Sequence, residues 1–346
     1  MITNLLLLAC TSTPSVTLPP GPTAGGPTTP PLTTLTPPDT APTGPVDTGT
    51  DDTGTAVTTQ VGFPWVDYDC SLGVPAPPFA HRILAGTGSN EDIVLDMDGY
   101  LVAADWSGNL IHYTHDGDGA VWATSFGDPT GLEVLPDGDL AVADRSEGRV
   151  VTRDSVTGAV TVVESNIAWP NGLEIAPDGS IFVNDTYEGA VYRIEPATGL
   201  VEQVASGLPL PDGLTFDVTY HTLYVGSLGG PQIFSIPVNG PGDFGEPVQL
   251  DLPEPVPWEY SDGMAVDRCG NLYIADFWGS IWRVFLDTKV IEPIYQSTSN
   301  EWIPAIRFGS NLGGFDGLKL YASTYTEALE IDIGVPGKPR WPAVWP

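Results

Sequence analysis

The chain has little positive charge. Its 346 residues include 12 Lys and Arg against 44 Asp and Glu, which gives a formal net charge of −32. Nucleic-acid binding depends on clustered Lys and Arg at the phosphates, so we expect no nucleic-acid partner. The acidic balance favours a cationic partner instead, although solubility alone would also explain it.

The chain also lacks a long apolar run. The apolar stretch within residues 1–10 is too short to span a bilayer, which takes about 20 residues, and it is typical of an export signal. Leu7-Leu8-Ala9-Cys10 resembles the lipobox of bacterial lipoproteins, which implies a lipid anchor on Cys10. The expected location is the bacterial cell envelope, at the outer membrane or cell surface. No Lys or Arg precedes Cys10, so a chance hydrophobic N-terminus is the alternative.

Residues 11–60 lack the apolar content of a folded domain. They contain 17 Thr and 11 Pro with no Lys or Arg. Such a segment cannot bury enough apolar surface to offset the entropy of ordering it. We therefore predict a disordered stalk, followed by one folded domain over 61–346.

Cysteines are few. Besides Cys10, the chain has only Cys70 and Cys269, an even pair for an oxidising compartment. We predict a disulfide that joins the N-terminal lead-in to a turn of the fifth repeat. Two free buried thiols are the alternative.

Helix-length apolar periods are absent, and short strand patterns recur instead. Four stretches open in the same way and are followed by a strand, a tight turn and a second strand: Pro129-Thr130-Gly131, Pro170-Asn171-Gly172, Pro211-Asp212-Gly213 and Ser261-Asp262-Gly263. Their glycines are 41, 41 and 50 residues apart, the period of β-propeller blades. With further blades opening near Glu91 and Pro304, the pattern predicts an all-β, six-bladed β-propeller. Arg82-Ile83-Leu84 is expected to complete the last blade and close the ring.

The residue before each repeat glycine indicates function. We expect these positions, just before each innermost strand, to meet at the mouth of the central channel. They are Glu91, Thr130, Asn171, Asp212, Asp262 and Ala305. Three carboxylates and an amide oxygen at one point would repel one another without a cation. The predicted metal ligands are Glu91, Asn171, Asp212 and Asp262, and Ca²⁺ is preferred over Mg²⁺, Mn²⁺ and Zn²⁺.

Each pair taken singly could be an ordinary turn, because Asp-Gly and Asn-Gly are common turn formers. Their shared repeat phase argues against it. Asp137-Gly138 and Asp178-Gly179 fall at a different phase, and we predict that they are only turns at the opposite end of the blades.

The segments 170–179 and 261–273 resemble the SMP-30/gluconolactonase/LRE-like six-bladed propellers, and Glu91-Asp92-Ile93 is similar to the start of paraoxonases. Strictosidine-synthase-like propellers share the cadence. The resemblance covers the chain from Glu91 onward. It implies a divalent metal, usually calcium, with Glu91, Asn171 and Asp262 matching family ligands. Asp212 stands where asparagine is more usual.

The resemblance further implies hydrolysis of a lactone or ester. The metal would polarise the carbonyl, and Asp262 or Asp212 would act as general base. His112 and His115 are alternative bases, or ordinary structural residues. The expected substrate-binding residues are Thr130, Trp169, Trp258, Tyr260 and Trp302. For the four aromatic residues, packing within the blades is the alternative.

Two other functions remain open. A tethered propeller with a structural calcium would be a binding module, and an NHL-like scaffold without metal is a third class. An open coordination position beside a base would distinguish the hydrolase from the binding module. A closed propeller needs no partner for stability, so we expect a monomer.

Overall fold

The computed structural model of the protein describes residues 63–64, 66–84, 91–324 and 326–340. The predicted signal at 1–10, with Cys10, and the predicted stalk at 11–60 lie outside these residues. Within the described ranges no helix is both long and apolar enough to cross a bilayer.

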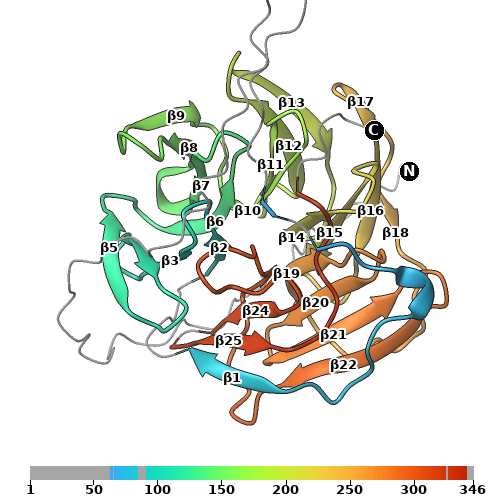
Figure 1. Ribbon diagram of the computed structural model, residues 1–346. Coiled ribbons are helices and arrows are strands. Elements are labelled where there is room, and N and C mark those ends of the chain that lie inside the picture. The colour runs from blue at the N-terminus through green and yellow to red at the C-terminus, as the bar shows by residue number, and fades with distance from the viewer. Residues whose placement is uncertain (1–62, 65, 85–90, 325, 341–346) are drawn as a thin grey trace, which may run out of the picture. The chain divides into compact units, whose positions relative to one another are not determined.

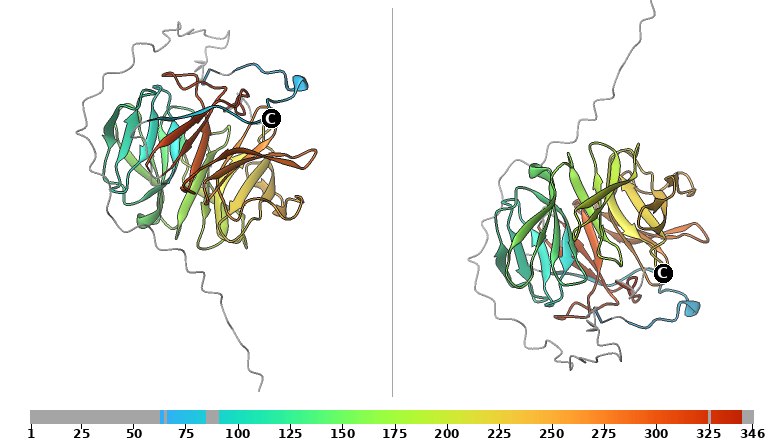
Figure 2. Two further views of the ribbon diagram at one scale, coloured as in Figure 1. Left: turned by 90° about the horizontal axis from the view of Figure 1, so that it is seen from below. Right: turned by 90° about the horizontal axis from the view of Figure 1, so that it is seen from above.

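The described residues form six antiparallel sheets around a central axis, which confirms the six-bladed β-propeller (Figure 1). Colour in Figure 1 changes from sheet to sheet around the axis, because each of blades 1 to 5 is one successive stretch of chain. The side views in Figure 2 show the sheets standing side by side. The innermost strands of neighbouring blades are in contact all the way round.

The first three blades follow one another in sequence. Blade 1 contains β2 (Ile93–Leu95), β3 (Leu101–Ala104), β4 (Leu110–Tyr113) and β5 (Gly119–Ala123). Blade 2 contains β6 (Pro129–Val134), β7 (Leu140–Asp144), β8 (Arg149–Arg153) and β9 (Val160–Glu164), with the 3₁₀ turn η2 (Arg145–Glu147). Blade 3 contains β10 (Pro170–Ile175), β11 (Ile181–Asp185), β12 (Ala190–Glu195) and β13 (Leu200–Ala205).

The last three blades continue the pattern. Blade 4 contains β14 (Pro211–Phe216), β15 (Thr222–Ser227), β16 (Phe234–Gly240), β17 (Asp243–Phe244) and β18 (Val248–Gln249). Blade 5 contains β19 (Ser261–Val266), β20 (Leu272–Asp276), β21 (Ser280–Phe285) and β22 (Val290–Gln296). Blade 6 contains β23 (Ala305–Phe308), β24 (Leu320–Ser323), β25 (Ala328–Ile331) and β1 (His81–Leu84).

Blade 6 closes the ring with a strand from the other end of the chain. β1 pairs antiparallel with β25, with His81 opposite Ile331 and Leu84 opposite Ala328. Figure 1 shows the blue β1 beside the red β25. The closing strand predicted at Arg82-Ile83-Leu84 is therefore correct, and the pairing covers the edge that an open sheet would expose.

Burial falls from the axis outward. The second strand of blade 2, β7, is buried along its whole length and apolar over residues 140–143, whereas β9 at the outer edge is exposed at Val160 and Val162. A short continuous apolar run is typical of a strand covered on both faces. The core lies between adjacent sheets, as where Val142 and Val151 of blade 2 cluster with Ile181 of blade 3.

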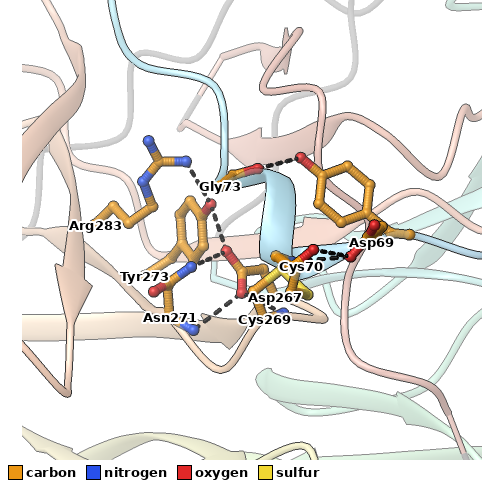
Figure 3. Close-up of a disulfide and its surroundings, with 10 residues drawn as sticks. Asp69, Cys70, Gly73, Asp267, Cys269, Asn271, Tyr273 and Arg283 are labelled. Atoms are coloured by element: carbon orange, nitrogen blue, oxygen red, sulfur yellow. Dashed lines mark hydrogen bonds between the residues drawn. A yellow bond between two sulfur atoms is a disulfide. The ribbon is translucent and has the colours of Figure 1, made fainter.

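A disulfide fixes the lead-in to blade 5, as predicted. Cys70 lies in the 3₁₀ turn η1 (Cys70–Leu72) and bonds to Cys269, with their Cα atoms 5.5 Å apart (Figure 3). The turn that holds Cys269 is ordered by Asp267, whose carboxylate accepts the backbone N–H groups of Cys269 at 2.8 Å and Asn271 at 2.9 Å. The alternative of two free thiols is wrong.

Candidate functional site

Four of the predicted channel-mouth residues are the second residue of an innermost strand. They are Thr130, Asn171, Asp212 and Asp262, in β6, β10, β14 and β19. The sequence pattern predicted a place just before each strand, but each strand begins one residue before these positions. In all four strands the pairing register shifts at this point. Such bulges bend a strand and redirect a side chain.

The glycine that follows each of these residues lets the blades approach closely. A Cβ built on Gly131 would lie 2.1 Å from the carbonyl oxygen of Asn171 in the next blade. A Cβ on Gly213 would lie 1.9 Å from the carbonyl oxygen of Asp262. These glycines are therefore required by contact between blades, not by a turn, and the turn interpretation of the pairs is wrong.

The redirected side chains line one small cavity in the channel. Its lining includes Glu91, Thr130, Asn171, Asp212 and Asp262, and its volume is about 20 Å³. Glu91 comes from the segment just before β2, and all five residues are buried. A water occupies about 10–15 Å³ on this measure, so the cavity has room for an ion or one or two waters. The body of an organic substrate would have to lie above it.

Ala305 and Thr130 differ from the other predicted channel-mouth residues. Ala305 is the first residue of β23 and presents no oxygen side chain. The Thr130 hydroxyl donates to the carbonyl oxygen of Pro170 at 2.9 Å, so it links blade 2 to blade 3.

Burial and mutual repulsion raise the pKa values of the three carboxylates. Burial raises the pKa of Glu91 to about 8, against the attraction of Arg145 and together with repulsion from Asp212. Burial raises the pKa of Asp212 to about 7, again against Arg145. The pKa of Asp262 lies well above its usual range because of burial and then repulsion from Asp212 and Glu91. The three acids therefore need protons or further positive charge near neutral pH.

Arg145 is a site residue that the sequence interpretation missed. It begins η2, and its Nη1 atom lies 3.0 Å from Oε1 of Glu91 while Nε donates to Asp128 at 2.8 Å. Its guanidinium also lies over the ring of Trp169, 5.3 Å from the centroid. A usable signal was its place in the turn between the second and third strands of blade 2, which returns the chain to the channel mouth.

The four predicted aromatic residues differ in their contacts. Trp169 packs on Arg145 as described, and the Trp302 indole N–H donates to Oδ2 of Asp262. Trp258 is buried among the core residues of blades 4 and 5, and its indole N–H donates to the carbonyl of Pro231 at 3.0 Å. Tyr260 contacts Phe277, with ring centroids 6.1 Å apart. None of the four lines the small cavity itself.

The two histidines lie away from this cavity. His112 of β4 is 3.0 Å from Oδ2 of Asp96 and stacks against Trp122, with ring centroids 4.1 Å apart. His115 hydrogen-bonds Oε2 of Glu330 at 2.5 Å. The structure thus places both in structural contacts of blades 1 and 6.

A second charged layer lies deeper in the channel. Arg307 of β23 binds Oδ2 of Asp92 at 2.8 Å, and burial raises the pKa of Asp92 to about 6 despite this guanidinium. Further along, Lys338 donates to Oε2 of Glu174 at 2.7 Å and to the Thr215 hydroxyl at 3.0 Å. The chain after the last strand therefore enters the channel and places Lys338 there.

This C-terminal strap, residues 336–340, is held by further contacts. Arg340 lies 3.5 Å from Oε1 of Glu133, and Tyr220 donates to the carbonyl of Pro339 at 2.9 Å. Glu133 and Glu174 occupy the same repeat phase, two residues after Gly131 and Gly172. This shared phase was a signal that the two glutamates lie at the same level of the channel. The sequence interpretation did not use that signal.

The side chains around the small cavity offer the type of ligand that a hard cation prefers. Three carboxylates and one amide offer only oxygen, which is the ligand type of Ca²⁺ and Mg²⁺. As the side chains stand, no group of three or more His, Cys, Asp or Glu in the described part of the chain is close enough together to hold a metal ion. Arg145 already binds Glu91, so one of the three acids has a cationic partner.

Comparison with known proteins gives one family. A family model described as SMP-30/Gluconolactonase/LRE-like region matches residues 91–321. No curated protein matches the chain.

Solved structures share the fold at low identity. A gluconolactonase from Xanthomonas campestris has a TM-score of 0.65 and 18% identity, covering 82% of this chain and 99% of that one. A calcium-binding protein, regucalcin, from Agrobacterium tumefaciens has a TM-score of 0.60 and 17% identity, covering 78% and 98%. A luciferin-regenerating enzyme has a TM-score of 0.63 and 15% identity, covering 75% and 97%.

Proposed function

This chain belongs to the SMP-30/gluconolactonase/LRE-like family, and on that premise we propose that it is an exported, metal-dependent hydrolase of a lactone or ester. The family is of lactonase type, and a small molecule is the corresponding substrate class. The observation that supports the proposal most strongly is the set of three buried carboxylates and an amide around a cavity of about 20 Å³.

We assign the metal to Glu91, Asn171, Asp212 and Asp262, and Ca²⁺ is the preferred ion. Three carboxylates would balance the charge of a divalent cation. The site offers only oxygen donors, which favours Ca²⁺ over zinc and copper, because those two ions prefer softer ligands. When bound, a divalent cation would polarise the substrate carbonyl and stabilise negative charge on its oxygen. The solved relative described as a calcium-binding protein supports this choice of ion.

The residues of this chain supply the proton chemistry. A carboxylate accepts a proton from water best when its pKa lies near the working pH. Asp212 and Asp262 are the candidate bases, and burial raises the pKa of both carboxylates in the metal-free protein. The indole N–H of Trp302 donates to one oxygen of Asp262, a residue that lines the cavity. Arg145 pairs with Glu91 through Nη1 and with Asp128 through Nη2.

We further propose export to an oxidising compartment, with Cys10 as the lipid anchor. The Cys70–Cys269 disulfide supports this, because such bonds persist mainly outside the cytosol. Mass spectrometry of the mature N-terminus would test the anchor. We expect a lipidated Cys10 in the membrane fraction and loss of membrane association in Cys10→Ser, and an unmodified N-terminus would contradict it.

The function is tested by elemental analysis and hydrolysis together. The purified protein would be analysed for bound metal and assayed on a lactone and an aryl ester, before and after EDTA. We expect about one calcium per chain, an increase in Tm on adding calcium, and loss of both metal and turnover in Asp262→Asn. Asp137→Asn is the matched control, because Asp137 is an exposed turn residue of blade 2.

Each outcome has a distinct meaning. Calcium with turnover lost after EDTA supports the hydrolase. Calcium without turnover on any lactone or ester supports the binding module instead. A protein that retains no calcium, and whose Tm calcium does not raise, would refute the metal assignment.

A further inference from the structure

A groove of about 430 Å³ lies at one end of blade 5, outside the channel. Its walls come from the loop before β19, the turn between β20 and β21, and the segment after β22. Ser261 at the start of β19 pairs with Asp276 at the end of β20, so the groove is at the same end of the blade as the channel mouth. Its volume falls in the range of small-molecule sites, about 300–1,000 Å³.

Three tryptophans line this groove: Trp258, Trp278 and Trp282. Trp278 is 47% exposed, which is unusual for the largest apolar side chain. Each indole N–H is already used within the protein. Trp278 donates to Oε2 of Glu259 at 2.8 Å and Trp282 to the Ser280 hydroxyl at 2.9 Å, while Trp258 donates to a backbone carbonyl. These bonds fix the orientations of the rings, which can offer a ligand only their π systems.

The groove is acidic as well as aromatic. Glu259 and Asp276 line it, and no Lys, Arg or His is among the described residues that do. Asp276 is buried and accepts the Ser280 hydroxyl at 3.0 Å, whereas Glu259 is exposed. A carboxylate has about four acceptor positions, so Glu259 can accept further donors while it holds Trp278. The net charge of −32 adds a negative field over the surface.

We propose that this groove binds an organic cation, a quaternary ammonium or protonated amine. Indole faces attract such cations through the ring quadrupole, and nearby carboxylates complete the charge balance. A neutral sugar could stack on the same rings, but a groove with two carboxylates and all three indole N–H groups already engaged favours a positively charged ligand. The proposal does not depend on hydrolysis or on a metal.

The groove is connected to the channel through aromatic contacts. Trp278 meets Phe277 with ring centroids 5.4 Å apart, and Phe277 meets Trp302 at 5.3 Å. Trp302 in turn donates to Asp262 in the channel. A cation in the groove would therefore sit beside the candidate site and not inside it.

The test compares choline with its neutral isostere 3,3-dimethyl-1-butanol by calorimetric titration of the full protein at low salt with EDTA present. We expect choline to bind at least about tenfold more tightly than the isostere, since only charge distinguishes them. Glu259→Gln and Trp278→Ala should each weaken choline binding about three- to tenfold. Trp106→Ala is the matched control, because Trp106 is 60% exposed on blade 1, and it should leave binding unchanged.

The circular-dichroism spectrum and Tm of each variant would show that the fold is kept. Equal binding of choline and the isostere would overturn the proposal. So would saturation by glucose in the absence of choline binding, which would assign the groove to a neutral sugar. Equal loss of binding in the Trp106→Ala control would also overturn it, because it would place the ligand elsewhere.

Discussion

Replacing both Cys70 and Cys269 with serine should destabilise the propeller substantially. The bond closes a loop with a sequence separation of 199 residues, so it restricts much of the unfolded chain. The folded lead-in has other contacts to keep it in place. Tyr68, Val74 and Phe79 pack against the core of blades 5 and 6, so the native state should keep its structure without the bond.

The magnitude follows from loop entropy. For a loop of about 200 residues the chain-entropy model gives a stabilisation of about 5 kcal/mol at 25 °C. A domain of this size unfolds with an entropy of about 0.6 kcal/mol per kelvin. The double variant should therefore unfold about 8 °C below the wild type. Reduction of the wild type should lower its Tm by a similar amount.

Scanning calorimetry of the double variant measures this difference directly. Ser71→Ala is the matched control, since it alters η1 but leaves the disulfide intact, and its Tm should fall by less than about 1 °C. A Tm loss below about 2 °C in the double variant would refute the loop-entropy argument. Two reactive thiols in the unreduced protein would show that the bond does not form.

Three further predictions concern charge and packing. Burial raises the pKa of Glu330, but hydrogen bonds from basic neighbours lower it more strongly, so the net shift is downward. The ionised Glu330 carboxylate therefore stabilises the fold above about pH 4.3, and this stabilisation is lost as the pH falls below that value. Glu330→Gln should cost about 2 kcal/mol near neutral pH in denaturant unfolding, with a difference that shrinks in acid. Gly213→Ala should cost at least about 3 kcal/mol or prevent folding, because its Cβ would meet the backbone oxygen of Asp262 at 1.9 Å. Arg145→Gln should bind calcium about tenfold more tightly in a calcium titration, because it frees Glu91 from a competing cation.

Each of these has a clear contrary result. A Glu330→Gln penalty that stays constant down to pH 3 would show that the charge of Glu330 does not contribute to stability. Wild-type stability in Gly213→Ala would mean that the blades can separate at little cost. Unchanged or weaker calcium binding in Arg145→Gln would show that the arginine does not compete for the site.

The fold could be predicted because the repeat has a strict steric cause. Gly131 and Gly213 abut a backbone oxygen of the next blade, so the motif marks every contact between blades from 2 to 5. Closure by β1 could be predicted in the same way, because the repeat pattern left the last blade without its outermost strand. The sequence could not show the bulges, and the position of Asp262 inside β19 was therefore missed.

The candidate site was only partly predictable. Glu91, Asn171, Asp212 and Asp262 share a repeat phase, and the structure brings them to one cavity. Arg145 and Lys338 lie outside that phase, in a turn and in the strap after the last strand. Their place in the channel depends on chain geometry that periodicity does not encode. The metal-binding roles of Glu91, Asn171, Asp212 and Asp262 remain predictions.

The pairing of β1 with β25 sets an order of events during synthesis. The strand at His81–Leu84 is made before any other strand of the propeller, whereas its partner at Ala328–Ile331 is made only after blades 1 to 5. Until then every nascent chain has two uncovered sheet edges, which are sites for wrong pairing and for chaperones. Lys338, which enters the channel, is made later still. Closing the ring and filling the channel therefore both wait for the segment from Ala328 onward.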